Sequence, residues 1–339
     1  MTARRNLITD VAGLRVGNAH DARIASGATI VLAAQPNVAS VVVRGGAPGS
    51  RDTALLEPDM SVQGVDGIVL SGGSAFGLDA AGGAMVVLRE HGLGFTIGSA
   101  IIPIVPQAIT FDMLNGGDKN WGRRSPYWDL GLAAAEAALA GDGAAFALGT
   151  QGGGYGTTTA NYKGGLGSAS AVTSGGHTVG AIVVVNAVGS ATVGDGPHFW
   201  AAPVEQNGEF GGLGLPQPVP AAALRMRIKG GGPPSTTIAV VATDAVMTKA
   251  EAKRLAIMAD DGLARAIRPA HAPMDGDTVF AIATCHKAMR PGTYDLTEIG
   301  MVAADCLARA IARGVYEATT LPFPGALPAW RDRFGGGKP

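Results

Sequence analysis

Apolar residues recur along this chain in short runs rich in Val, Ile and Ala, and glycines bound most of these runs. Runs of this kind are typical of buried β-strands joined by tight turns, with helices packed close to the sheet. The pattern predicts strands at 28–34, 39–44, 67–70, 145–148, 179–185, 237–242 and 278–284.

Helical periodicity marks the segments 76–90, 130–139, 249–267 and 300–313. Thr248 and Glu251 have the spacing of a capping box at the start of the third helix, and Pro269 follows its end. Strands in runs, with helices grouped, favour a layered α+β sandwich over strict βαβ alternation. The Pro- and Gly-rich stretch 203–234 is typical of a long exposed loop or linker.

Composition narrows the classes of function. The 339 residues carry a net charge of −1, so no basic surface points to nucleic acid or to an anionic membrane. No apolar run approaches the roughly 18 residues of a membrane span. The start of the chain lacks the apolar core of a signal peptide, so we expect a cytoplasmic protein.

The segment 231–244 holds the most specific candidate chemistry. A Gly/Pro loop runs into a strand, and Ser235, Thr236 and Thr237 stand at the join. A peptide bond cut there would leave a Ser or Thr whose hydroxyl attacks and whose α-amine takes the proton.

Two further groups of polar residues end or precede predicted strands. Asp275 and Asp277 flank a glycine just before the strand at 278–284; this is a common turn, and in a hydrolase such a pair can also polarise a proton acceptor. Asn186 ends the apolar run 179–185, where a structural cap and an oxyanion donor are both open readings.

No cofactor or metal is predicted from the remaining motifs. The six histidines form no close pair, and Cys285 and Cys306 stand in no metal-ligand spacing, so we expect the histidines to be structural or on the surface. The turn 71–77 follows a strand and opens a helix, yet its glycine spacing does not fit a dinucleotide loop. A nucleotide-binding enzyme using 72–77 is therefore the weakest alternative.

Ordered blocks along nearly the whole chain carry a family resemblance. They lie at 7–17, 44–53, 65–81, 102–106, 163–170, 239–244 and 274–278. With these blocks the chain resembles the self-processing N-terminal-nucleophile aminopeptidases. That family includes L-aminopeptidase/D-Ala-esterase/amidase, the β-peptidyl aminopeptidases and the nylon-oligomer hydrolases.

The resemblance implies one domain over residues 1–339, folded as a four-layer αββα sandwich. It also implies that a precursor cuts itself before a Ser or Thr two residues ahead of the strand's Ile or Val, which selects Thr236. The products would be an α chain, 1–235, and a β chain, 236–339. The same matching places Asp275 and Asp277 beside the nucleophile, makes Asn186 the active-site Asn, and suggests a homotetramer of processed heterodimers.

Three positions depart from the family pattern. Ser235 stands where many relatives have Asn before the cut. Asn161 falls at the place of the family's catalytic lysine, whereas Lys163 matches a second family lysine and becomes the candidate electrostatic helper. Phe111 aligns with a Tyr near the site of nylon hydrolases, so we expect Phe111 and Asn161 to contact substrate.

Alternatives stay open at this point. Ser235 is a second candidate nucleophile, after a cut between Pro234 and Ser235. The chain could also be an unprocessed family member that acts in binding or assembly. Substrate candidates are peptides with a free N-terminus, β-amino-acid amides, D-alanyl esters or amides, and aminohexanoate oligomers.

Overall fold

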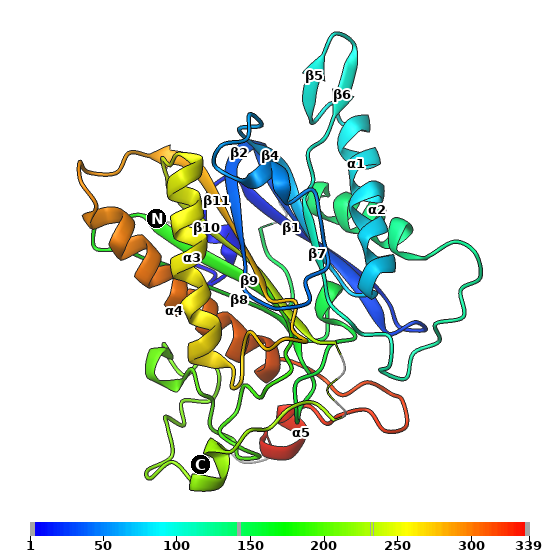
Figure 1. Ribbon diagram of the computed structural model, residues 1–339, viewed down its shortest axis with the longest axis vertical. Helices are drawn as coiled ribbons and strands as arrows, with labels where there is room; N and C mark the ends of the chain where they lie inside the picture. The colour runs from blue at the N-terminus through cyan, green and yellow to red at the C-terminus, as the bar shows by residue number, and fades with distance from the viewer. Residues whose placement is uncertain (1–3, 141–143, 231, 233, 336–339) are drawn as a thin grey trace.

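The computed structural model describes residues 4–140, 144–230, 232 and 234–335, so Gly231 and Pro233 of the predicted junction lie outside the described residues. Two layers of strands lie face to face between two pairs of helices (Figure 1). Helices α1 and α2 cover one outer face, and α3 and α4 cover the other. The predicted αββα sandwich is therefore confirmed.

The elements have the following bounds. The strands are β1 Leu14–Asp21, β2 Ser26–Val43, β3 Ser50–Arg51, β4 Val65–Ser71, β5 Phe95–Ile97, β6 Ala100–Ile102, β7 Gln107–Ile109, β8 Gly165–Val172, β9 Thr178–Asn186, β10 Thr236–Ala245 and β11 Thr278–Lys287. The helices are α1 Ala80–Glu90, α2 Tyr127–Leu139, α3 Lys249–Ala266, α4 Tyr294–Tyr316 and α5 Trp330–Phe334.

Strand β2 belongs to both layers. Its first half pairs with β1 and β4, and its second half pairs antiparallel with β11. The hydrogen-bonded order among the described strands is β3-β7-β4-β2-β11-β10-β9-β8. Strand β10 thus lies between β9, its antiparallel neighbour, and β11, its parallel neighbour.

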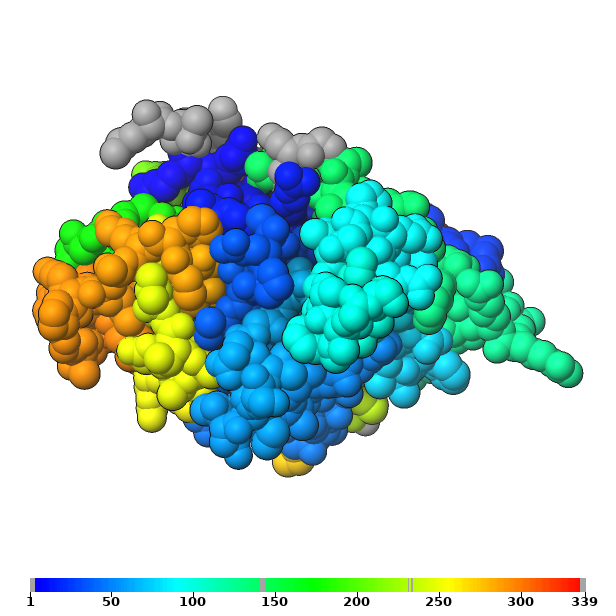
Figure 2. Space-filling model, turned by 90° about the horizontal axis from the view of Figure 1, so that it is seen from above, coloured from blue at the N-terminus to red at the C-terminus, as the bar shows by residue number. Residues whose placement is uncertain are grey.

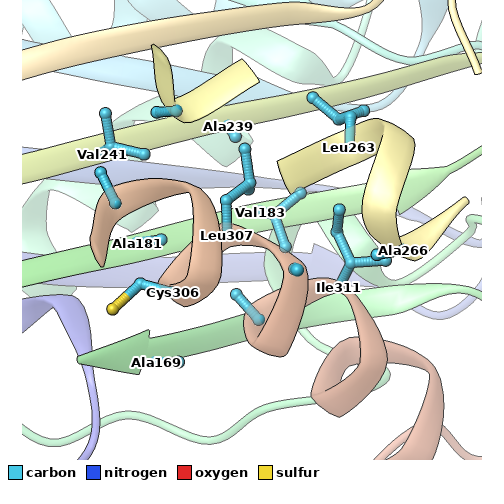
Figure 3. Packing of buried hydrophobic residues seen from close by; sticks show 14 of the residues in the cluster. Ala169, Ala181, Val183, Ala239, Val241, Leu263, Ala266, Cys306, Leu307 and Ile311 are labelled. Atoms are coloured by element: carbon cyan, nitrogen blue, oxygen red, sulfur yellow. The ribbon is translucent and has the colours of Figure 1, made fainter. Parts of the chain in front are cut away.

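Alternation along the central strands explains why their sequence is almost continuously apolar. Val183, Ala239 and Val241 face α3 and α4, where Leu307 of α4 packs against them (Figure 3). Ile238 of β10 points the other way, into the space between the two strand layers. Since both faces of β9 and β10 are covered, each position favours an apolar side chain.

Close packing also explains a strand that the pattern did not predict. Strand β8 begins with Gly165 and contains Gly167, so it lacks the β-branched signature. A Cβ on Gly167 would lie 1.8 Å from the carbonyl oxygen of Ala310 in α4. Glycine at this point lets the helix lie directly on the strand.

Most predicted elements are present with shifted bounds, and the helix predicted at 76–90 becomes α1 only from Ala80. The strands expected at 28–34 and 39–44 form the single strand β2, and the capping box at Thr248 and Glu251 is formed. The strand predicted at 145–148 is wrong: 144–148 have no regular structure, and only Gly149 pairs, with Leu166 of β8. Gly149 has a φ of +81°, which turns the chain away after one pair.

The prediction of an exposed linker at 203–234 is also wrong in part. Phe210 is only 2% exposed and packs against Phe199 with ring centroids 5.4 Å apart. Phe210 therefore anchors the segment on the body of the protein, although most of its described positions are exposed. On the opposite side, the chain between β7 and α2 extends outward beside the helix pair α1–α2 (Figure 2).

None of the helices within the described ranges is both long enough and apolar enough to span a membrane.

Candidate active site

The predicted junction lies at the first residue of β10. Ser235 and Thr236 are 0% and 3% exposed, so the peptide bond between them is buried in the uncut chain. The Thr236 hydroxyl donates a hydrogen bond to the carbonyl oxygen of Ser235. The nucleophile candidate is thus held against the carbonyl group that it would attack.

The turn from Asp275 to Asp277 wraps around this carbonyl. The amide of Gly276 donates to the Ser235 oxygen at 2.8 Å, and the Ser235 amide donates to the carbonyl oxygen of Met274 at 3.1 Å. The scissile carbonyl therefore receives donors from the Thr236 hydroxyl and from the Gly276 amide. Because the Thr236 hydroxyl is the attacking group, the Gly276 amide is the donor that remains on this oxygen to stabilise an oxyanion.

Both aspartates of this turn are buried and hydrogen-bonded to backbone amides. Asp277 accepts from the Thr237 amide at 2.8 Å, directly after the junction. Asp275 accepts from the amides of Ala272 at 3.0 Å and Val188 at 3.3 Å. Burial, together with the nearby charge of Asp277, raises the pKa of Asp275 to about 6.

His271 contacts Asp277 on the side away from Thr237, in a structural role of the kind expected for the histidines. Its Nδ1 lies 3.0 Å from Asp277 and its Nε2 lies 3.3 Å from Asp260 of α3. Hydrogen bonds to Asp260 and Asp277 raise the pKa of His271 to about 10. The imidazolium fixes the orientation of Asp277 and compensates its charge.

Asn186 ends β9 directly opposite Thr236 in the antiparallel register. Its side-chain oxygen accepts from the Thr158 amide at 3.1 Å, and its side-chain nitrogen donates to the carbonyl oxygen of Phe111 at 2.9 Å. An amide nitrogen carries two hydrogens, so one remains for a further acceptor. Asn186 also lines the adjoining cavity.

That cavity measures about 460 Å³, and two lysines line it together with Asn186 and Phe111. We call it the lysine cavity. Lys163, 1% exposed, donates to the carbonyl oxygens of Gly154 and Gly164, both at 3.0 Å. Its pKa falls to about 7, chiefly because burial disfavours the charged form.

Lys229 is the group that sequence reasoning missed. Its Nζ lies 3.1 Å from the side-chain oxygen of Asn186, and burial lowers its pKa to about 7 even though Asp275 opposes that shift. The alternation Arg225, Arg227, Lys229, with no other charged residue in 210–234, is the signal that the sequence offers for it. An exposed linker, as predicted for this stretch, would leave such cations in solvent.

Asn161 is directed away from the lysine cavity. Its side-chain nitrogen donates to Thr192 at 2.9 Å and to the carbonyl oxygen of Gly194 at 3.0 Å, and its oxygen accepts from Ser190 at 2.9 Å. These partners line a second cavity. Of the two positions considered for the family's lysine, Lys163 is the one that faces the lysine cavity.

Comparison with known proteins identifies the family. The model of the family described as Peptidase family S58 matches residues 6–326. The chain belongs to peptidase family S58. Membership in S58 makes it a hydrolase of peptide or amide bonds, of the aminopeptidase and amidase type.

Two similar sequences illustrate the range of the S58 family. A Mycobacterium bovis protein named as an uncharacterized aminopeptidase is 44% identical over 352 aligned positions, covering 98% of this chain and 98% of that protein. A 6-aminohexanoate-oligomer endohydrolase of Kocuria sp. is 28% identical, covering 84% of this chain and 76% of that enzyme.

Solved structures share the fold. A β-aminopeptidase of Burkholderia sp. superposes with a TM-score of 0.71 at 24% identity, covering 100% of this chain and 96% of that chain. The L-aminopeptidase D-Ala-esterase/amidase of Ochrobactrum anthropi gives 0.68 at 22% identity, covering 99% and 96%. The second is described as a variant of the Ntn-hydrolase fold, and at these identities the likeness concerns the fold alone.

Proposed function

We propose that this S58 hydrolase activates itself by cutting the Ser235–Thr236 bond and that Thr236 is its nucleophile. The main support for this proposal is that the Ser235 carbonyl oxygen accepts hydrogen bonds from both the Thr236 hydroxyl and the Gly276 amide. The nucleophile and an oxyanion donor are therefore in place on one buried peptide bond before any substrate arrives.

The processing step follows from these contacts. The Thr236 oxygen attacks the Ser235 carbonyl carbon, the C–N bond breaks, and an ester to Ser235 forms while the α-amine of Thr236 is released with the hydroxyl proton. Water then hydrolyses the ester, leaving a carboxylate on Ser235 and restoring the Thr236 hydroxyl. The Gly276 amide stabilises the oxyanion of the attack.

The mature Thr236 then acts on an amide bond of a small substrate in the lysine cavity. Its α-amine, with a usual pKa of about 7.7–8.0, takes the hydroxyl proton near neutral pH. The remaining hydrogen of the Asn186 side-chain nitrogen stabilises the oxyanion. Asp275 and Asp277 position the new amine, because Asp277 already holds the next amide of the strand.

The two lysines complete the proposed mechanism. Lys229, with a pKa of about 7 and its Nζ next to Asn186, exchanges a proton near neutral pH and is suited to protonate the leaving amine. Lys163 also lines the lysine cavity, and with a pKa of about 7 it acts as an electrostatic helper in its protonated form. The aminopeptidases and oligomer hydrolases among the relatives suggest small amides as substrates, and Phe111 offers an apolar contact for them.

The two fragments are expected to stay together after the cut. Strand β10 of the 236–339 fragment lies between β9 of the first fragment and its own β11, and β11 pairs with β2 of the first fragment. Many backbone hydrogen bonds and a shared core thus join the fragments. We propose that the processed pair then assembles as the homotetramer that the family resemblance implies.

Intact mass measurement of the purified protein tests the proposal. We expect two fragments, 1–235 and 236–339, and amidase activity on amino-acid amides. Thr236→Ala should give one uncut chain without activity. Full activity in a chain that stays uncut would refute the scheme.

Ser235 is the rival nucleophile, and one variant separates the two. Ser235→Ala should still be cut before Thr236 and stay active if Thr236 is the nucleophile. Loss of both properties, with wild-type mass showing a fragment that begins at Ser235, would instead assign the role to Ser235. An intact, inert wild-type protein would favour a binding or assembly role.

A further inference from the structure

A second cavity of about 430 Å³ lies beside the lysine cavity and has a different chemistry. Three arginines line it: Arg225, Arg227 and Arg268. We call it the arginine cavity. Its inner wall carries the buried hydroxyls of Ser190 and Thr192, which are 3% and 1% exposed.

Positive charge exceeds negative charge in this cavity. Asp195 is the one carboxylate among the described residues that line it, and it pairs with Arg227 at 2.5 Å. Arg268 lies over the ring of Trp200, 5.8 Å from its centroid, and donates to the carbonyl oxygen of Leu224 at 3.2 Å. Two guanidinium groups therefore have no carboxylate among the lining residues.

The backbone of one of these arginines, Arg268, is fixed by the wall of the cavity. Backbone hydrogen bonds join Arg268 and Ser190 in both directions, at 2.9 and 3.0 Å. The Asn161 side chain supports this wall through hydrogen bonds with the hydroxyls of Ser190 and Thr192. Guanidinium groups present a rigid fork of donors that matches the oxygens of a carboxylate or phosphate.

We propose that the arginine cavity binds a small molecule through an oxyanion group, either a phosphate or a carboxylate. Guanidinium donors from three positions and the excess positive charge both favour such a group. The proposed hydrolysis uses none of these residues. The site is therefore separate from the catalytic proposal, although Arg227 stands only two residues before Lys229.

Calorimetric titration of the full-length protein tests this proposal, with inorganic phosphate and succinate as separate probes at low salt. We expect saturable binding of at least one probe. Binding of phosphate alone identifies a phosphate site, and binding of succinate alone identifies a carboxylate site. The binding should weaken as NaCl is added, because surface charges are screened.

Two variants that change the charge of the cavity should change the affinity for the probe in opposite directions. Arg225→Gln should weaken binding about tenfold, as loss of one charge-assisted hydrogen bond does. Asp195→Asn should tighten it several-fold, because it removes the one carboxylate among the described lining residues and releases Arg227. Arg254→Gln, a change at an exposed arginine of α3, is the matched control and should leave the affinity unchanged.

Saturable binding of neither probe would overturn the proposal. So would equal affinity in Arg225→Gln, Arg268→Gln and the Arg254→Gln control. Thr236→Ala should bind the probe as the wild type does. The result of the titration therefore tests anion binding independently of self-processing.

Discussion

Two neighbouring cavities in this protein use cations in opposite ways. In the lysine cavity, burial brings the pKa of Lys163 and Lys229 down to about 7, where an amine exchanges its proton. In the arginine cavity, Arg225 and Arg268 are exposed, and guanidinium groups stay charged at any physiological pH. The first is suited to proton transfer and the second to holding an anion.

The difference between the two cavities comes from the path of the short segment 225–229. Arg225 and Arg227 line the arginine cavity, whereas Lys229, two residues on, lines the lysine cavity beside Asn186. A lysine responds to burial by losing its proton more readily, and an arginine does not. The choice of cation at each position therefore decides what each cavity can do.

The largest expected effect comes from Gly276→Ala. A Cβ at this position would lie 2.7 Å from the Thr236 hydroxyl oxygen and 2.8 Å from the carbonyl oxygen of Ala47. It would push the donor amide away from the Ser235 carbonyl, so we expect no detectable cut by intact mass measurement and no amidase activity.

A matched glycine variant controls for folding. Gly175→Ala would place its Cβ no closer than 3.3 Å to any neighbour, and it should be cut normally. If folded Gly276→Ala, with a melting temperature near that of Gly175→Ala, is still processed, the proposed role of the Gly276 amide is wrong.

Next in size is Lys229→Arg, which places the cation of one cavity in the other. Charge is retained but proton exchange near neutral pH is lost, so we expect kcat to fall about 100-fold or more. The acidic limb of the kcat–pH profile should also move from near 7, the pKa of Lys229, toward about 8, the pKa of the Thr236 α-amine. Lys287→Arg, at an exposed position, should retain the wild-type profile.

A smaller effect should appear in stability as a function of pH. His271 has a folded-state pKa of about 10, above its usual 6.5, so its stabilisation is complete below pH 6.5 and is lost as pH rises through about 10. We expect the melting temperature of the wild type to fall over this range. His271→Asn should flatten that fall.

Asparagine is the appropriate replacement because His271 has a φ of +56°, which Asn tolerates better than most residues. His91→Asn, at an exposed position after α1, is the control and should leave the pH dependence in place. A fall that persists unchanged in His271→Asn would assign the dependence to other groups.

The ends of regular strands made part of the candidate site predictable from sequence. Thr236 begins β10, Asn186 ends β9, and Asp275 and Asp277 precede β11, so neighbouring strands bring these four residues together. The apolar runs that predicted the strands thereby also located these side chains. Their catalytic roles stay predictions.

The site residues that the sequence pattern did not predict lie in segments without regular secondary structure. Lys229 follows a Pro- and Gly-rich segment, and His271 follows the end of α3, so no periodic pattern sets the path of either. Their positions depend on tertiary packing, as with Phe210, which anchors the irregular segment. Local pattern cannot supply such contacts, because they join residues far apart in the sequence.

The smallest expected effect belongs to Arg225→Lys, the reverse exchange of cation types. At this exposed position burial does not depress the pKa of a lysine, so the charge should be kept and only the forked donor geometry lost. We expect about a twofold to threefold weaker affinity for the probe anion, against about tenfold for Arg225→Gln, in the same titration. An equal loss in both variants would mean that guanidinium geometry, rather than charge, dominates anion binding in the arginine cavity.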